Sequence, residues 1–372
     1  MNQTNFIPLV DLRAQYLGIK EEIDGAINDC IAEGTFVKGQ IVTEFENAFS
    51  KFLGIDWCVG CGNGTDALEL ILKSLNIGSG DEVIVPALTW IATAEAVNNV
   101  GAEPVFVDIK TDTYTLDAGK IENKITKRTK AIIPVHLYGC PADMNEITAI
   151  GRKYNLFIVE DCAQAHGAEY YGKKVGTFGI ASAFSFFPSK NLGAFGDGGA
   201  VVTDNQELAD TVRKISNHGQ LKTRHSHSII GRNSRLDTIQ ASILRVKLNH
   251  LNQWNNNRIN AARFYKSKLK DIDALILPLV QNNKMHVYHL FVIRSKQRNE
   301  LIEALSKNGI ASGIHYPTPL PFLEAYNYKQ HKPGDFPIAT GISGEILSLP
   351  MYPEITTSQI DTICEILIKA SS

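Results

Sequence analysis

An aspartate and a lysine each follow an apolar run that is typical of a buried strand. Asp161 comes after residues 156–159, and Lys190 comes after residues 183–187 and before a stretch rich in glycine. In open α/β sheets, ligands collect at the carboxyl ends of the strands. A lysine amine can form a Schiff base with a carbonyl, and a carboxylate beside a pyridine nitrogen keeps that nitrogen protonated. The two side chains could therefore hold one cofactor from two sides.

Each of these residues alone also has a simpler explanation. An aspartate at the end of a strand is often a helix cap, and a lysine before a glycine loop is usually a solvated charge. Pyridoxal phosphate needs both groups at once. The pair, more than either residue, points to this cofactor.

A phosphate-bearing cofactor needs hydrogen-bond donors, and a glycine turn supplies a candidate. Asn63, Gly64 and Thr65 open an expected helix, where unpaired N–H groups and the helix dipole favour an anion. Asn-Gly is equally a common turn signal. Trp90 follows another expected strand, and its ring could stack on a pyridine face or simply fill the core.

Two longer strings carry a family resemblance. EDCAQAHGA, which contains Asp161, and FSFFPSKNLGAFGDGGA, which contains Lys190, resemble blocks of the DegT/DnrJ/EryC1/StrS family of sugar aminotransferases. Further blocks resemble the family in the same order: NGTDAL, DEVIVPALTWIATAEA, AIIPVHLYG, GRNSRLDTIQASIL and IHYP. They span most of the chain. Dehydratases of this family resemble the chain with a histidine in place of the Schiff-base lysine, so Lys190 favours an aminotransferase.

The resemblance implies a role for each matching residue. Lys190 would be the catalytic lysine and Asp161 the partner of the pyridine nitrogen of pyridoxal 5'-phosphate (PLP). The other implied cofactor contacts are Gly64, Thr65 and Ser185 on the phosphate, Trp90 on the ring face, Gln164 on the phenolic oxygen, and Asn233 from the neighbouring subunit. The active site would then be shared within a homodimer.

The implied reaction transfers an amino group from glutamate to a nucleotide-linked keto sugar. His315 and Tyr316 are expected to contact the substrate, and Arg224 and His225 could approach a nucleotide diphosphate, although the basic stretch 222–227 could also be a solvated loop. The opening IPLVDLRAQY resembles enzymes that aminate C-3, which favours a dTDP-3-keto-6-deoxyhexose. Amination at C-4 and a UDP-linked 3-keto amino sugar are the alternatives. A binding or regulatory protein that keeps the fold without turnover is the alternative from another class.

Composition bounds the remaining classes of function. The net charge of -2 over 372 residues predicts no bulk attraction to nucleic acid or to an anionic membrane. The N-terminus does not read as a signal peptide, and the six scattered cysteines predict free thiols in the cytoplasm. Cys58 and Cys61 form a C-x-x-C that could serve redox chemistry or half a zinc site, but no second pair matches it, so buried thiols and no metal are expected.

The pattern of elements predicts an α/β protein of PLP-dependent transferase fold type I. Strands alternate with helices, which predicts a mainly parallel mixed sheet flanked by helices in a large domain, residues 1–245. A smaller C-terminal α+β domain, residues 246–372, should follow along a long helix. The expected strands are 83–85, 105–107, 131–135, 156–159, 183–187, 200–202, 287–293 and 310–316; the expected helices are 44–53, 93–99, 118–125, 236–269, 299–307 and 358–369. The final strands of the large sheet have no helix between them, which predicts an antiparallel strand there, and residues 325–337 are expected to form an irregular surface loop.

Overall fold

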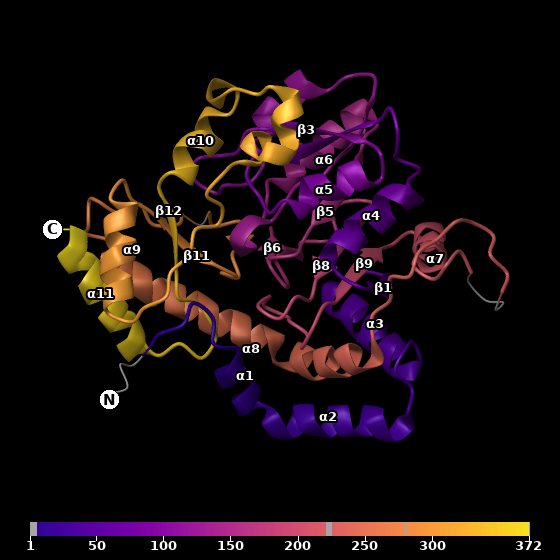
Figure 1. Ribbon diagram of the computed structural model, residues 1–372, viewed down its shortest axis with the longest axis horizontal. Coiled ribbons are helices and arrows are strands. Elements are labelled where there is room, and N and C mark those ends of the chain that lie inside the picture. The colour runs from indigo at the N-terminus through magenta and orange to yellow at the C-terminus, as the bar shows by residue number, and fades with distance from the viewer. Residues whose placement is uncertain (1–5, 221–224, 280, 372) are drawn as a thin grey trace.

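A seven-stranded mixed sheet forms the centre of the computed structural model, which describes residues 6–220, 225–279 and 281–371. The strand order is β1-β9-β8-β5-β4-β2-β3 (Figure 1). The bounds of these strands are β1 Trp57–Cys61, β2 Glu82–Pro86, β3 Glu103–Val107, β4 Thr129–Ile132, β5 Phe157–Asp161, β8 Ala181–Ser185 and β9 Gly199–Thr203. The predicted parallel mixed sheet is confirmed.

Strand β9 is the antiparallel member of the sheet. It pairs antiparallel with both β8 and β1, whereas β8, β5, β4, β2 and β3 pair parallel with one another. β1 therefore runs in the same direction as β8. A loop without a helix joins β8 to β9, as the sequence predicts, so the chain turns back directly. This loop contains Lys190.

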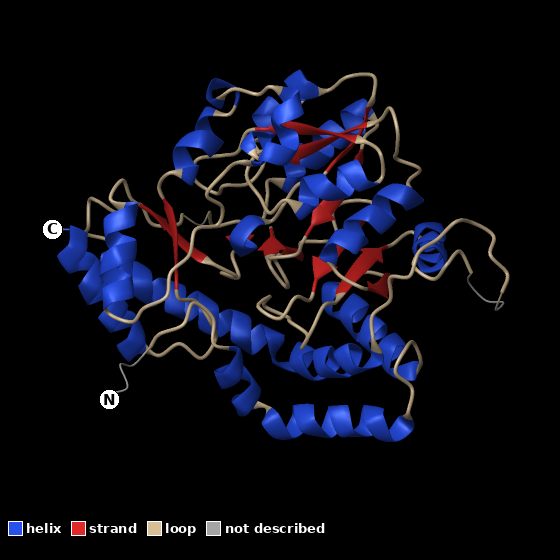
Figure 2. Ribbon diagram, in the orientation of Figure 1, coloured by secondary structure: helices blue, strands red, loops and turns tan. Residues whose placement is uncertain are grey.

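Helices cover both faces of the sheet (Figure 2). Apolar residues of α4, α5 and α7 share one hydrophobic cluster with Val59, Val85 and Val159 of the strands. Residues of α3, α6 and α8 share a second cluster with Ile84 and Ile132. Strand residues that alternate between two buried faces explain the near-continuous apolar runs in the sequence. The bounds are α3 Gln40–Leu53, α4 Gly64–Ser74, α5 Ala92–Asn99, α6 Met144–Tyr154, α7 Gln206–Ile215 and α8 Thr238–Leu269.

The C-terminal part of the chain builds a third cluster around the far end of α8. Ala262 and Tyr265 of α8 pack there with β11, β12, α9 and α11. The segment that contains Leu320 and Ala339 instead joins the first cluster, beside the large sheet. The bounds are β11 Phe291–Arg294, α9 Arg298–Lys307, α10 Pro337–Ser343, β12 Ile346–Leu349 and α11 Thr357–Ser371. The division at residues 245 and 246 stays a prediction.

Short elements complete the structure at the N-terminus and beside the sheet. α1 Leu12–Gly18 leads into α2 Lys20–Glu33, which lies along α8. The two small sheets are β11 with β12 and the three-stranded β10-β6-β7, whose strands are β6 Glu169–Tyr170, β7 Lys173–Lys174 and β10 Lys284–Met285.

Three local predictions were wrong. Residues 118–125 form two 3₁₀ turns, Ala118–Lys120 and Glu122–Lys124, because Asp117 caps a tight turn at the amide of Gly119. Residues 310–316 make only isolated bridges, at Ile310 and Gly313. The predicted surface loop 325–337 contains 3₁₀ turns, and Tyr326 and Phe336 within it are buried. Apolar side chains that pack on the sheet explain this last difference.

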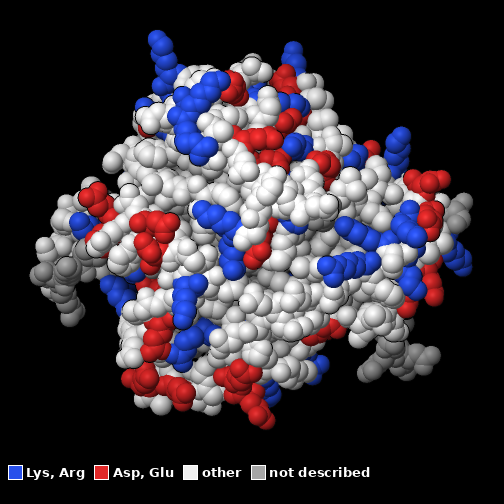
Figure 3. Space-filling view, turned by 180° about the vertical axis from the view of Figure 1, so that it is seen from behind, with Lys and Arg blue, Asp and Glu red and all other residues white. Residues whose placement is uncertain are grey.

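The surface and the thiols agree with the composition. Figure 3 shows one face on which Lys and Arg side chains are interspersed with Asp and Glu side chains. All six cysteines are buried free thiols, as predicted. Within the described residues, no helix has the length and apolar character that a bilayer crossing demands.

Candidate active site

Apart from Asn233, the predicted cofactor residues gather at one edge of the sheet. β1, β2, β5 and β8 run in one direction, so their carboxyl ends share this edge. Gly64 follows β1, Trp90 follows β2, Asp161 ends β5, and Ser185 ends β8, with Lys190 just beyond it. This is the edge at which open α/β sheets bind ligands.

Asp161 is a buried carboxylate with few partners. Its side chain is 6% exposed, and its two oxygens accept hydrogen bonds from the Thr93 hydroxyl at 2.8 Å and the Ala163 amide at 3.1 Å. Burial raises the pKa of Asp161, while these hydrogen bonds and the positive charge of Lys190 act in the opposite direction. A buried acid of this kind is stabilised as a carboxylate by a cationic group placed against it.

Lys190 lies in the tight loop between β8 and β9. Its amide donates to the Phe187 carbonyl at 2.8 Å, and the loop is compact because a side chain at Gly193 would overlap the Pro188 carbonyl. The loss of solvent around the amine lowers the pKa of Lys190 to about 8, although the charge of Asp161 acts to raise it. A larger fraction of this amine is neutral near pH 7 than in an exposed lysine, which suits a nucleophile.

The start of α4 forms a cradle for an anion. The Asn63 side chain caps the helix by accepting from the Asp66 amide at 2.8 Å, so the first-turn amides of Gly64 and Thr65 remain for a ligand. A Cβ on Gly64 would lie 2.7 Å from the Cβ of Ser185, so only glycine allows this close approach. Ser185 accepts from the Phe187 amide at 3.3 Å and keeps its hydroxyl proton for donation. These residues fit a phosphate group.

The side chain of Gln164 is oriented by the backbone amide of Tyr138. Its oxygen accepts from the Tyr138 amide at 2.6 Å, and its nitrogen donates to the Tyr316 hydroxyl at 3.0 Å. The amide of Tyr138 reaches Gln164 from a left-handed backbone conformation, with φ of 60°. One N–H of the Gln164 side chain is used by Tyr316, and the other remains for an acceptor on a ligand.

Trp90 and His315 border the same site. The Trp90 side chain is 57% exposed, and its ring centroid lies 5.5 Å from that of Tyr316. An exposed tryptophan at a strand end is suited to stacking on a ligand. His315 pairs with the Ser348 hydroxyl at 2.8 Å; burial and the nearby charge of Lys190 both lower its pKa. The structure thus brings Trp90, Gln164, His315 and Tyr316 to the site of Lys190.

Three predicted residues are not placed there within one chain. Asn233 is exposed beside α4, where the neighbouring Arg232 pairs with Asp66. His225 is exposed on the loop after α7, which extends away from the sheet (Figure 1). Arg224 lies outside the described residues. The roles of these three residues stay predictions.

Several residues at the site were missed by sequence reasoning. Thr93 holds Asp161, and Tyr138 orients Gln164. Thr93 follows Trp90 closely at the start of α5, so its position was a usable signal. The role of Tyr138 depends on a backbone amide in an unusual conformation, for which side-chain type gives no signal.

Two cysteine clusters have structural explanations. Cys58 and Cys61 lie on opposite faces of β1, one in each hydrophobic cluster, so the C-x-x-C cannot close a disulfide in this fold.

The second cysteine cluster consists of His136, Glu160 and Cys162, whose ligand atoms are close enough to hold a metal ion. Protein groups already occupy the histidine and the carboxylate: His136 contacts Glu160 at 3.1 Å and accepts from the Ala142 amide. Backbone amides of Gly176, Phe178 and Gly179 also donate to Glu160.

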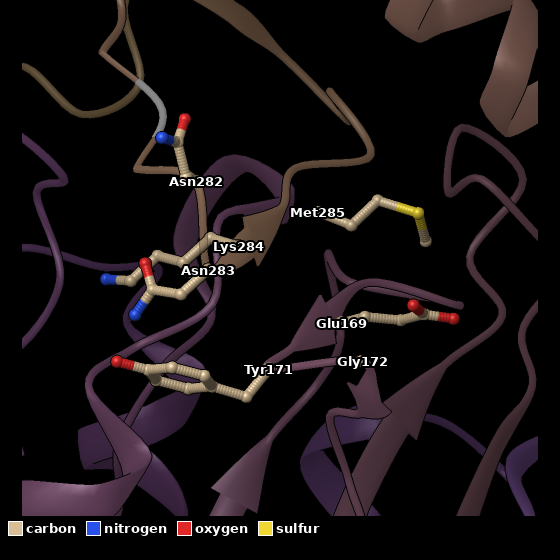
Figure 4. A pocket seen from close by; sticks show the side chains of 7 residues that line it. All are labelled: Glu169, Tyr171, Gly172, Asn282, Asn283, Lys284 and Met285. Atoms are coloured by element: carbon tan, nitrogen blue, oxygen red, sulfur yellow. The ribbon is translucent and has the colours of Figure 1, made fainter.

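A groove of about 500 Å³ opens elsewhere on the surface, beside the β6–β7 turn and the segment that leads into β10 (Figure 4). Glu169, Tyr171 and Asn283 line it, and none of the predicted site residues does. Its lysine, Lys284, pairs with Asp143 at 2.7 Å. This groove is therefore separate from the candidate active site.

A phosphate cradle, a buried carboxylate and a lysine amine at one sheet edge define a site for a phosphorylated pyridine cofactor. Comparison with known proteins agrees with this class. The chain belongs to the DegT/DnrJ/EryC1/StrS aminotransferase family, whose model matches residues 18–368.

Curated relatives cover nearly the whole chain. A UDP-N-acetyl-3-dehydro-alpha-D-glucosamine 3-aminotransferase of Acidithiobacillus ferrooxidans is 46% identical, over 99% of this chain and 98% of the relative. A dTDP-3-amino-3,4,6-trideoxy-alpha-D-glucose transaminase of Streptomyces venezuelae is 43% identical, over 96% and 94%. A protein of Geobacillus stearothermophilus named pleiotropic regulatory protein is 41% identical, over 96% and 97%.

Solved structures share the fold. DesV of S. venezuelae, determined in complex with a ketimine intermediate, superposes with a TM-score of 0.96 at 41% identity and covers 99% of both chains. NtdA of Bacillus subtilis, determined with the bound cofactor PMP, has a TM-score of 0.88 at 31% identity and covers 95% of this chain and 82% of its own. The predicted fold type is therefore confirmed.

Proposed function

We propose that this protein transfers an amino group from glutamate to C-3 of a nucleotide-linked 3-keto sugar, with PLP as cofactor. The observation that carries this proposal is the pair formed by the buried Asp161 carboxylate and the Lys190 amine, whose charges interact at one sheet edge. Bound PLP would supply an electron sink that stabilises negative charge on the carbon being deprotonated.

Each residue has a defined task in this proposal. Asp161 holds the positive charge on the pyridine nitrogen, and Thr93 holds the carboxylate in place. Lys190 would anchor the cofactor, and its freed amine would accept and return the proton of the substrate carbon, for which a pKa of about 8 is well suited. Gly64, Thr65 and Ser185 bind the phosphate. Trp90 would stack on the ring face, and Gln164 would donate to the phenolic oxygen.

The relatives support a nucleotide-linked substrate that is aminated at C-3. The names of the S. venezuelae and A. ferrooxidans relatives both place the amino group at C-3. A dTDP-3-keto-6-deoxyhexose is our first choice. A UDP-linked 3-keto amino sugar is the second candidate, which the relative with 46% identity favours.

A homodimer with shared active sites is part of the proposal. Asn233 is exposed on the surface of this chain, so its side chain is accessible to the active site of a second copy. Sedimentation equilibrium of the purified protein should give twice the mass of the chain. A monomer that turns over substrate would contradict the shared site.

Product analysis tests the substrate assignment. The purified protein is incubated with PLP, glutamate and, in turn, dTDP- and UDP-linked 3-keto and 4-keto sugars, and the position of the new nitrogen is located by NMR. We expect amination at C-3 of a dTDP-linked sugar. Exclusive amination at C-4, or no product with any member of the panel, would contradict the proposal.

The Geobacillus relative named as a regulatory protein supports a second candidate function, that of a regulatory or binding protein without turnover. A binding protein without turnover would leave the glutamate unchanged even when PLP is bound. Appearance of 2-oxoglutarate from glutamate in a single turnover, measured with stoichiometric protein and lost in Lys190→Ala, would exclude this alternative.

A further inference from the structure

The residue after Lys190 is held by three different parts of the fold. Asn191 is 1% exposed. Its side-chain nitrogen donates to the Asn255 oxygen at 2.9 Å and to the Val287 carbonyl at 3.1 Å, and its oxygen pairs with His289 Nδ1 at 3.2 Å. Both N–H groups and the oxygen of the Asn191 side-chain amide therefore have hydrogen-bond partners within the protein.

Asn255 connects this loop to the loop after β5. Its oxygen accepts from Asn191, and its nitrogen donates to the His166 carbonyl at 2.8 Å. His166 ends the segment that begins with Asp161 and includes Gln164. The side chain of Asn255, a residue of α8 that is 3% exposed, thus bridges the loop that carries Lys190 and the loop that begins with Asp161.

A second residue of α8 contacts the loop that carries Lys190, at a position two residues after Asn191. Lys247 is 1% exposed and donates to the Gly193 carbonyl at 2.8 Å and to the Gln15 side chain at 3.1 Å. The backbone on the C-terminal side of Lys190 is therefore fixed to α8 at two points. A helix of 32 residues gives these contacts a rigid support.

We infer that Asn255 is a positioning residue that sets the separation between Lys190 and Asp161. The two side chains must reach opposite sides of one ring, and a small displacement between their loops would prevent both from engaging it. Asn255 makes no contact with the candidate cofactor site itself. It acts through Asn191 on one loop and through His166 on the other.

This inference rests on the proposed role of Lys190, and the experiment separates the two. Protein is loaded with PLP and divided. One half is reduced with borohydride, and the cofactor fixed to Lys190 is measured by peptide mass analysis; the other half is denatured without reduction to give total bound cofactor. The ratio of fixed to bound cofactor reports whether the lysine reaches the ring, whatever fraction of the protein is folded.

Asn255→Ala is expected to lower this ratio by about tenfold, the equivalent of ~1.4 kcal/mol. Leu251→Ala is the matched control, because Leu251 is a fully buried residue of the same helix that packs in the second hydrophobic cluster. It should reduce stability and leave the ratio unchanged. Asn191→Ser, which shortens the other side of the bridge, should lower the ratio as well and serves if Asn255→Ala does not fold.

An unchanged ratio in folded Asn255→Ala, or in folded Asn191→Ser if only that variant folds, would overturn the inference. An equal fall in Leu251→Ala would do the same, since general loosening of α8 would then explain the effect. If the parent protein is fixed at a different lysine, the proposed role of Lys190 fails instead.

Discussion

At the scale of single residues, the site depends on two ionisable groups whose pKa values are shifted in opposite directions. Burial raises the pKa of Asp161 and lowers the pKa of Lys190 to about 8, so each group is less readily charged than in water. A bound ring with a protonated nitrogen gives Asp161 a cationic partner, and a neutral amine is the form of Lys190 that attacks a carbonyl. The site is therefore prepared for the cofactor before it binds.

Replacing Asp161 with asparagine should reduce turnover far more than stability. Opposite charges about 4 Å apart at an effective dielectric near 20 interact by roughly 4 kcal/mol, so kcat/KM for glutamate should fall by about a thousandfold. Stopped-flow measurement of the glutamate half-reaction checks this. Thermal unfolding of the variant serves as the control, and a loss of activity below tenfold would argue against the carboxylate as the partner of the ring nitrogen.

Lys190 should make the cofactor-free protein less stable at neutral pH. The unfolded chain binds the proton of this lysine up to pH 10.5 and the folded chain only up to about 8, so stability rises with pH across that window. Cofactor-free Lys190→Met should be more stable than the parent at pH 7, by about 3 kcal/mol. Urea denaturation at pH 7 and pH 10 measures the difference, which should shrink at the higher pH; a constant difference would refute the lowered pKa.

At the scale of elements, the ends of strands and the starts of helices bring the site together. β1 leads into α4, β2 into α5, and β5 and β8 into the two loops that α8 connects through Asn255. Glycine makes the closest of these approaches possible. Gly64 lies against Ser185, and a Cβ on Gly199 would overlap the carbonyl of Asn63 at the start of α4.

Adding one methyl group at Gly64 should weaken cofactor binding. The new Cβ would lie 2.7 Å from the Cβ of Ser185 and displace the phosphate donors. The Kd for PLP should rise at least about tenfold, as expected for ~1.4 kcal/mol of lost contacts. Gly25→Ala, which has open space around it within α2, is the control. Fluorescence titration of both variants checks the result, and equal affinities would place the phosphate elsewhere.

The sequence predicts those features that depend on local pattern. Apolar runs and their alternation with helices predicted the parallel sheet, and the missing helix between residues 187 and 200 predicted the antiparallel strand. The hydrogen bonds from Asn191 to Asn255 and from Asn255 to His166 join distant parts of the chain, so no local sequence pattern predicts them. Residues 310–316 were predicted to form a strand, but within this segment only Ile310 and Gly313 form backbone bridges with other parts of the chain.

At the scale of the whole molecule, buried neutral histidines link stability to pH. Burial lowers the pKa of His166 and of His286 to about 3, and lowers the pKa of His289 well below its usual value. His166 is surrounded by aromatic rings, with the Phe184 and Phe186 centroids 5.3 and 5.8 Å away. These histidines gain protons on unfolding when the pH falls below about 6.5.

Acid should therefore destabilise the protein from pH 6.5 downwards. The unfolded state binds more protons than the folded state in this range, so each histidine costs about 1.4 kcal/mol per pH unit. Urea denaturation at pH 7, 6 and 5 should show this steep decline. His166→Phe, which places an apolar ring among the phenylalanines, should make the decline shallower; an unchanged slope would show that His166 does not contribute.

The central claim is that Asp161 and Lys190 hold one cofactor ring from two sides. A crystal structure of the protein grown with PLP tests it most directly. We expect continuous density from Lys190 to the cofactor, the Asp161 carboxylate about 2.8 Å from the ring nitrogen, and the phosphate at the start of α4. Density for the ring in any other cavity, or a ring nitrogen that faces no carboxylate, would contradict the account.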